Sequence, residues 1–152
     1  MYEEARRVEL CCYDLLKKYQ GVFVPRQLPD TAFKQRNDLM FVLNKCDPAL
    51  PYHAIFEWVG PLVGGHYRWL PQAAWELMEH HVKCLHEAGV AHNDLGENNF
   101  SYDVDSHRLY IYDFSDAFIK DTREGVEDKG FQEACEMDWK SVRCFCSTSI
   151  YR

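Results

Sequence analysis

The sequence predicts a single α+β domain, because segments with a helical repeat of apolar residues alternate with shorter runs that have the composition of strands. The chain has 152 residues, which is the size of one ordinary domain. Hydrophobic residues make up 47% of it and charged residues 27%, so we expect a packed core rather than a disordered or repetitive chain.

Three segments have the helical repeat. Residues 2–19 are predicted to form a helix that stops before Gly21, residues 72–88 a second helix that stops before Gly89, and residues 132–146 a third. The positions expected to be buried are Ala5, Val8, Cys12, Leu15 and Tyr19 in the first helix, Trp75, Met78, Val82 and Leu85 in the second, and Ala134, Met137, Val142 and Phe145 in the third.

Strands are predicted between these helices. Residues 39–43 and 53–59 are short apolar runs that favour an antiparallel pair, and two more short strands are expected around the polar turn of residues 105–107. Two prolines in residues 22–30 indicate an extended crossing, and residues 60–71, rich in glycine and proline, are the best hinge candidate. The acidic stretch of residues 116–128 is expected to be a solvated loop, and the charged residues 120–130 are also expected to form a loop.

Charge and cysteine content exclude several classes of protein. The net charge of -7 argues against a nucleic-acid binder that works through a basic face. No apolar run approaches the roughly 20 residues that span a bilayer, and the charged start has no signal-peptide core, so we expect no membrane association. The seven cysteines include no CxxC pair and are expected to be reduced, small buried hydrophobes. A cytoplasmic or nuclear location fits best.

The residues that indicate a chemistry lie between positions 92 and 115. His92, Asp94 and Asn99 spell His-x-Asp-Leu-x-x-x-Asn, and an Asp-Phe-Ser sequence begins at Asp113, fourteen residues after the asparagine. This combination resembles the catalytic loop and the metal-binding motif of the protein-kinase-like superfamily. The order of elements agrees with the resemblance: helix, His-x-Asp loop, β-hairpin, then Asp-Phe at the end of a strand.

The resemblance implies ATP-dependent phosphoryl transfer, a reaction that depends on positioning and charge neutralisation. Asp94 is then the catalytic carboxylate that accepts or orients the proton of the acceptor hydroxyl. Asn99 is a second catalytic-loop residue, and Asn99 with Asp113 would hold Mg²⁺, which prefers oxygen ligands. His92 would support the loop. The cofactors implied are ATP and Mg²⁺.

Upstream segments are similar to other parts of a kinase, in the manner of fungal kinase-like proteins. Residues 53–61 resemble the fifth strand and hinge, with Phe56 as gatekeeper and the backbone of Glu57 and Val59 facing adenine. The first helix resembles αC, with Glu9 as its glutamate; a solvated helix charge explains Glu9 equally well. Asp138 is a candidate for the αF aspartate that braces the catalytic loop.

The resemblance thus implies a truncated protein-kinase-like fold. Residues 1–59 correspond to a remnant of the small lobe from αC through remnant strands to the hinge. Residues 60–152 correspond to the start of the large lobe, with the αE helix, catalytic loop, β-hairpin and C-terminal helix. The Gly-rich loop, the strand lysine and Ala-Pro-Glu are not found. Gly96 stands where a lysine is usual, and Ser115 replaces the glycine of Asp-Phe-Gly.

These departures leave two classes of function open. The first is a phosphotransferase, weak or inactive as this chain alone, because losing one transition-state donor costs roughly 10²–10³ in rate. The alternative is a catalytically inactive pseudokinase that acts as a protein-binding module, or a fragment from an incomplete gene model. The acceptor, protein or small molecule, and any partner stay open.

Overall fold

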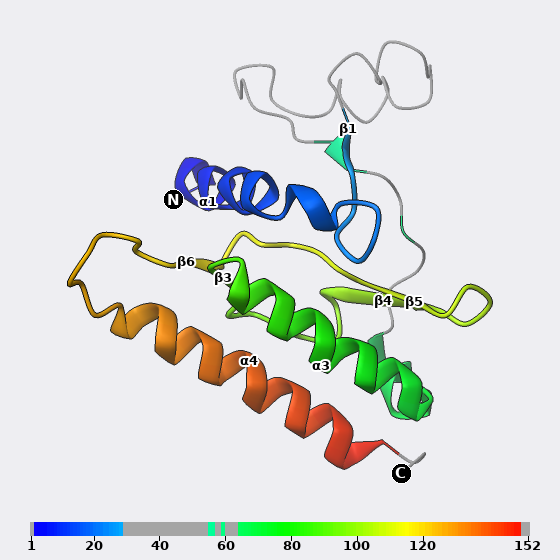
Figure 1. Ribbon diagram of the computed structural model, residues 1–152. Coiled ribbons are helices and arrows are strands. Elements are labelled where there is room, and N and C mark those ends of the chain that lie inside the picture. Colours follow the sequence, from blue (N-terminus) through cyan, green and yellow to red (C-terminus); the bar gives the residue numbers. More distant parts are fainter. Residues whose placement is uncertain (1, 29–54, 57–58, 60–63, 150–152) are drawn as a thin grey trace.

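The computed structural model describes residues 2–28, 55–56, 59 and 64–149 (Figure 1). The elements are, in chain order, α1 (Tyr2–Leu15), the 3-10 helix η1 (Lys17–Tyr19), β1 (Gln27–Leu28), β2 (Ile55–Phe56), the 3-10 helix η3 (Gly64–Trp69), α3 (Gln72–Glu87), β3 (Val90–Ala91), β4 (Phe100–Asp103), β5 (Arg108–Ile111), β6 (Phe118–Ile119) and α4 (Lys129–Thr148). The α+β class predicted from the sequence is confirmed.

The helices and strands form layers around one main core. Figure 1 shows α3 and α4 side by side and running in opposite directions, with β3, β6 and the hairpin between this pair and α1. The strands form three antiparallel pairs, β1 with β2, β3 with β6, and β4 with β5. The loop that carries the His-x-Asp motif connects β3 to β4.

Most of the helix and hairpin predictions are confirmed. The second predicted helix matches α3 to within a residue, and β4 and β5 pair across the predicted polar turn. The first helix ends early, at Leu15, before the single turn of η1, and α4 starts three residues before its predicted start. Gly89 follows α3 with a φ of 81°, the left-handed conformation that favours glycine after a helix.

Of the two strands predicted between residues 39 and 59, the structure describes only part of the second. Residues 39–43 lie outside the described residues. Of the predicted strand at 53–59, the structure describes β2, which pairs with β1 inside the segment predicted as an extended crossing. The sequence did not predict β1, β3 or β6, because a two-residue strand is too short to show an alternating pattern.

The core confirms the predicted stripe of α3, and in the other two helices it confirms Cys12, Ala134 and Val142 but not Leu15 and Met137. In α1, Leu15 is 44% exposed, while Cys12 and Leu16 are fully buried, because the row that faces the core runs at a spacing of four. In α4, Met137 is 48% exposed and its neighbour Asp138 is fully buried. Met137 was predicted to be buried because it is hydrophobic. Asp138 is buried instead, because its carboxylate has hydrogen-bond partners inside the protein.

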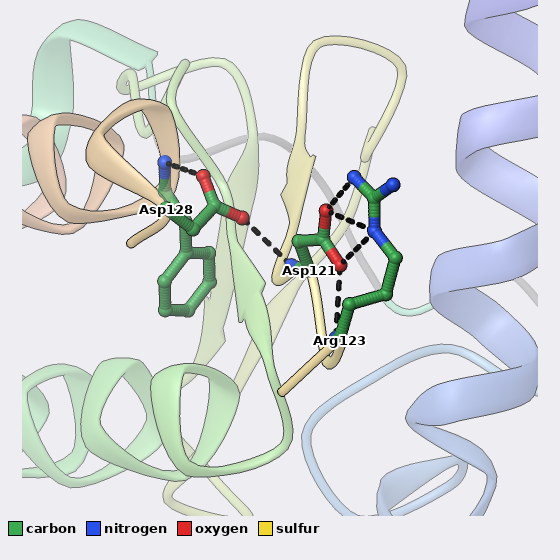
Figure 2. Close-up of polar contacts among 4 residues, drawn as sticks. Asp121, Arg123 and Asp128 are labelled. Atoms are coloured by element: carbon green, nitrogen blue, oxygen red, sulfur yellow. Dashed lines mark hydrogen bonds and ion pairs between the residues drawn. The ribbon is translucent and has the colours of Figure 1, made fainter. Parts of the chain in front are cut away.

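The acidic segment before α4 contains an exposed loop, as predicted, and hydrogen bonds fasten this loop to the start of the helix. The Asp128 carboxylate caps α4 by accepting from the backbone N–H of Phe131 at 3.0 Å, and it accepts from the N–H of Asp121 at 2.7 Å. Arg123 in turn binds both carboxylate oxygens of Asp121 (Figure 2). The segment is therefore fastened to the start of α4, although its outer side chains are exposed.

Two predictions about the whole chain can be compared with the described residues. Of the six cysteines among these residues only Cys12 is buried, and Cys11 and Cys144 are exposed, so the expectation that the cysteines are buried is wrong for most of them. None of the helices within the described ranges has the length and apolarity needed to cross a bilayer.

Candidate functional site

The loop of residues 92–99, hereafter loop 92–99, begins at a buried histidine. The His92 side chain is fully buried, and its ring Nε2 lies 2.9 Å from the carbonyl oxygen of Tyr112. Because a carbonyl only accepts, Nε2 carries the proton. The ring also contacts Phe114, with centroids 5.0 Å apart. The supporting role predicted for His92 is confirmed, since its ring ties the loop to the residues on either side of Asp113.

Asp138 holds loop 92–99 in place through hydrogen bonds to its backbone. Its carboxylate is fully buried on α4 and accepts from the backbone N–H of His92 through Oδ2 and of Asn93 through Oδ1, both at 2.8 Å. A third N–H, from His86 on α3, reaches Oδ2 at 2.9 Å. A buried carboxylate is tolerated only with such partners. Asp138 therefore braces loop 92–99, whereas its match to the αF aspartate of a kinase stays a prediction.

Asp94 and Asn99 are brought together at the two ends of a tight turn. The Asn99 side-chain amide donates to the Asp94 backbone oxygen at 2.7 Å and to its Oδ2 at 3.0 Å. Gly96 closes the turn, because its N–H binds the Asp94 carbonyl and its carbonyl accepts from the N–H of Asn99. Both donors of the asparagine amide therefore face Asp94, and its oxygen Oδ1 is left for another partner. Asp94 itself is exposed.

Asp113 lies just beyond the strand β5 that pairs with β4. The backbone N–H of Tyr112 donates to the Asn99 carbonyl at 3.0 Å, which fixes Asp113 one residue away from that contact. The Asp113 side chain is exposed, and its Oδ1 accepts from the Ser115 hydroxyl at 2.7 Å. Both Asp113 (φ 62°) and Asn93 (φ 65°) adopt the left-handed conformation. The left-handed conformation is common at functional sites, and Asn and Asp adopt it more easily than other residues with a side chain.

Glu9 of α1 lies beside Asp113. Burial raises the pKa of Glu9, the negative charge of Asp113 raises it further, and a backbone hydrogen bond from Phe114 and the charge of Arg6 oppose the shift. Glu9 is half-buried, which does not fit a fully solvated helix charge. The structure therefore places two carboxylates together at the outer end of the site. A role for Glu9 in cofactor binding stays a prediction.

The hinge residues are only partly described. The backbone of Phe56 pairs with Gln27 in β2, and Glu57 lies outside the described residues. The carbonyl oxygen of Val59 accepts from the Ser101 hydroxyl of β4 at 3.0 Å, so this oxygen faces the hairpin. The expected contacts of Phe56, Glu57 and Val59 with adenine stay predictions.

The oxygen atoms at this site suit magnesium. Asn99 Oδ1 and the Asp113 carboxylate are hard oxygen ligands, and Mg²⁺ is commonly held by one or two carboxylates together with substrate phosphates. Among the residues that the structure describes, no group of three or more His, Cys, Asp or Glu side chains could hold a metal. Binding of Mg²⁺ or of a nucleotide at Asn99 and Asp113 stays a prediction.

Sequence reasoning missed one member of the site. His86 contacts Asp138 across 52 residues of chain, and no local pattern connects the two positions. The only available signal was the run of four histidines within residues 80–92, of which three lie on α3.

Comparison with known proteins adds no family. No family model matches the chain, and no curated protein sequence matches it significantly.

Proposed function

We propose that the chain is a protein-kinase-like phosphotransferase that binds ATP with Mg²⁺ and transfers a phosphoryl group to a hydroxyl-bearing acceptor. The observation that carries the proposal is the contact of the buried Asn99 amide with Asp94, which fixes the exposed carboxylate of Asp94 in loop 92–99. A chance acidic turn would not also need the buried brace of Asp138 beneath it.

Each residue has a part that follows from its position. Asp94 is exposed in loop 92–99, where its carboxylate would accept the proton of the acceptor hydroxyl as that oxygen attacks the γ-phosphorus of ATP and ADP leaves. The Asn99 amide fixes Asp94 through its two N–H groups, so the carboxylate is oriented before the acceptor binds.

Asn99 and Asp113 are the residues that would hold magnesium. Asn99 presents Oδ1, and Asp113 presents its second oxygen, because Ser115 already binds the first. When bound, Mg²⁺ neutralises charge on the transferring phosphates. Glu9 increases the negative charge around Asp113, which favours a cation there.

The proposal is tested by thermal unfolding of the chain with and without Mg-ATP. A ligand present at a hundred times its Kd stabilises by about 2.7 kcal/mol, which raises the melting temperature of a domain this size by roughly 5–10 °C. We expect that rise in the wild-type chain and its loss in Asp113→Ala. Asp116→Ala is the matched control, because Asp116 is an exposed neighbour whose backbone oxygen, not its side chain, contacts Asn93.

Turnover is then measured by transfer of labelled phosphate, with Asp94→Asn as the variant that keeps the fold and removes the proton acceptor. A melting temperature that Mg-ATP leaves unchanged in the wild-type chain would contradict the proposal and would favour the alternative, a catalytically inactive binding module. A rise that persists in Asp113→Ala would show that the nucleotide binds elsewhere.

A further inference from the structure

The turn of residues 19–24, hereafter turn 19–24, follows η1 and is folded on itself. The Tyr19 carbonyl accepts from the backbone N–H groups of both Phe23 and Val24 at 3.1 Å. The side chains of Phe23 and Val24 are buried in the main core. The carbonyl of Phe23 accepts from the N–H of Ile111 in β5 at 2.8 Å. The turn is therefore a small unit that contacts the hairpin through its backbone and the core through its side chains.

His81 of α3 lies against this unit. Its ring is stacked on the ring of Phe23, with centroids 4.2 Å apart and planes inclined by 10°. Tyr19 packs against Phe23 at 4.7 Å. His81 is 6% exposed, and its Nδ1 is buried without a hydrogen-bond partner among the described residues. The imidazole thus holds Phe23 through a flat ring contact and not through a hydrogen bond.

The surroundings of His81 disfavour a positive charge. From turn 19–24 the ring is faced by Phe23, and on α3 the titratable neighbour is His80, whose ring centroid is 6.0 Å away. Burial lowers the pKa of His81 from 6.5 to about 4, the charge of His80 lowers it further, and no carboxylate among the described residues opposes the shift. The face of the Phe23 ring attracts a cation, but by less than burying an unpaired charge costs.

A proton therefore binds more tightly when turn 19–24 has moved away and water reaches the ring. The imidazole of this open form has its ordinary pKa of 6.5, so opening becomes more favourable as the pH falls below 6.5, down to about 4. The turn can open without the helices, because α3 and α4 keep their own backbone hydrogen bonds and only one backbone hydrogen bond joins Phe23 to β5.

We propose that His81 is an acid-sensitive switch: the neutral ring holds turn 19–24 against α3 and β5, and protonation of the ring releases the turn while α3, α4 and the hairpin stay folded. Release removes the hydrogen bond to Ile111, which lies two residues before Asp113. The switch does not rest on the proposed function, because it involves no nucleotide and no metal.

The test is hydrogen exchange of individual backbone amides, followed by NMR at pH 7 and pH 5. Each rate is divided by the intrinsic rate of the same amide in an unfolded chain at that pH. The reporters are the amides of Phe23, Val24 and Ile111, and the reference is the amide of Val142 inside α4. His81→Phe keeps a flat ring against Phe23 and does not titrate.

In the wild-type chain we expect the protection of the three reporters, relative to Val142, to be about 20-fold lower at pH 5 than at pH 7, as pKa values of 6.5 in the open form and about 4 in the closed form require. In His81→Phe the ratio should not change with pH. The control His80→Gln should still show the decrease, because burial, the larger cause of the shift, is retained.

Two outcomes of this experiment would overturn the proposal. An equal change at Val142 would mean that the turn opens only when the whole domain unfolds. A decrease of the ratio that persists in His81→Phe would mean that another group is responsible, since all other titratable groups are the same in both chains.

A second measurement needs only the wild-type chain and covers the case in which His81→Phe does not fold. The ¹⁵N chemical shifts of the His81 ring report whether it is protonated. We expect a neutral ring at pH 5, with the exposed His80 as the internal comparison. A ring that is protonated at pH 5 while the Ile111 amide keeps its protection would overturn the proposal, because the charge would then be accommodated with the turn in place.

Discussion

Asp138 and Asp113 mark the two ends of the site, and they differ in almost every physical respect. Asp138 is fully buried and accepts three N–H groups from α3 and loop 92–99. Asp113 is exposed, accepts from Ser115, and has the carboxylate of Glu9 beside it. At the inner end, marked by Asp138, the buried charge is paired with donors of the chain itself. At the outer end, marked by Asp113, two carboxylates lie together, and a bound cation would reduce their repulsion. We therefore expect the inner end to govern stability and the outer end to govern binding.

The largest effect is expected from Asp138→Ala. The substitution leaves two buried backbone N–H groups and His86 without their acceptor, and breaking a buried pair of this kind costs about 4 kcal/mol. Urea unfolding followed by circular dichroism should show a loss of that size in the free energy of unfolding. The exposed Asp116→Ala serves as the matched control and should change it by less than about 0.5 kcal/mol. A loss below about 1 kcal/mol for Asp138→Ala would mean that water replaces the carboxylate, and the comparison between the two ends would fail.

His81 sharpens the comparison, because it is almost as buried as Asp138 but its Nδ1 has no hydrogen-bond partner among the described residues. The ring stacks on Phe23 with centroids 4.2 Å apart. Burial lowers the pKa of His81 from 6.5 to about 4, and the neighbouring His80 contributes to the shift. The unfolded chain therefore binds a proton between pH 6.5 and about 4 that the folded chain does not.

It follows that the contribution of His81 to stability is fully present above pH 6.5 and is lost as the pH falls toward about 4. The full change is up to about 3 kcal/mol, since one pKa unit corresponds to about 1.4 kcal/mol. The measurement is the free energy of unfolding against pH for the wild type and for His81→Phe, which keeps the stacked ring and does not titrate. The difference between the two curves should change across this window. Parallel curves would show that the ring gains a partner when it is protonated.

The sequence predicted more of the site than of the sheet around it. Asp94, Asn99 and Asp113 could be proposed because the spacing of the motif is local, and the hairpin between Asn99 and Asp113 is set by a polar turn and two short apolar runs. The pairing of β3 with β6 was not found, because each strand has two residues and they are joined across the hairpin. Such pairs are determined by tertiary contacts, which leave no repeat in the sequence.

The third helix shows the same limit at single-residue scale. Hydropathy placed Met137 in the core, yet the buried residue is Asp138, whose stabilising partners come from α3 and loop 92–99. The resemblance to protein kinases suggested Asp138, but nothing local suggested His86. A polar residue enters a core through its hydrogen bonds, and those are visible only when distant segments have been brought together.

The smallest effect on stability is expected at the outer end, from Asp113→Asn. The pKa of Glu9 is raised above its ordinary value of 4.5, so its contribution to folding is present below pH 4.5 and is lost as the pH rises through the folded-state pKa. At pH 7 the folded chain therefore bears a cost, part of which comes from the charge of Asp113. Removing that charge should stabilise the chain at pH 7 by less than about 1 kcal/mol, because the pair is partly exposed to solvent.

The gain should vanish below pH 4.5, where Glu9 is protonated in both states. Unfolding free energies at the two pH values test this, with Asp116→Asn as the control. A loss of stability at pH 7 would mean that the hydrogen bonds from Ser115 outweigh the repulsion from Glu9, so that the outer end, like the inner one, is built for stability.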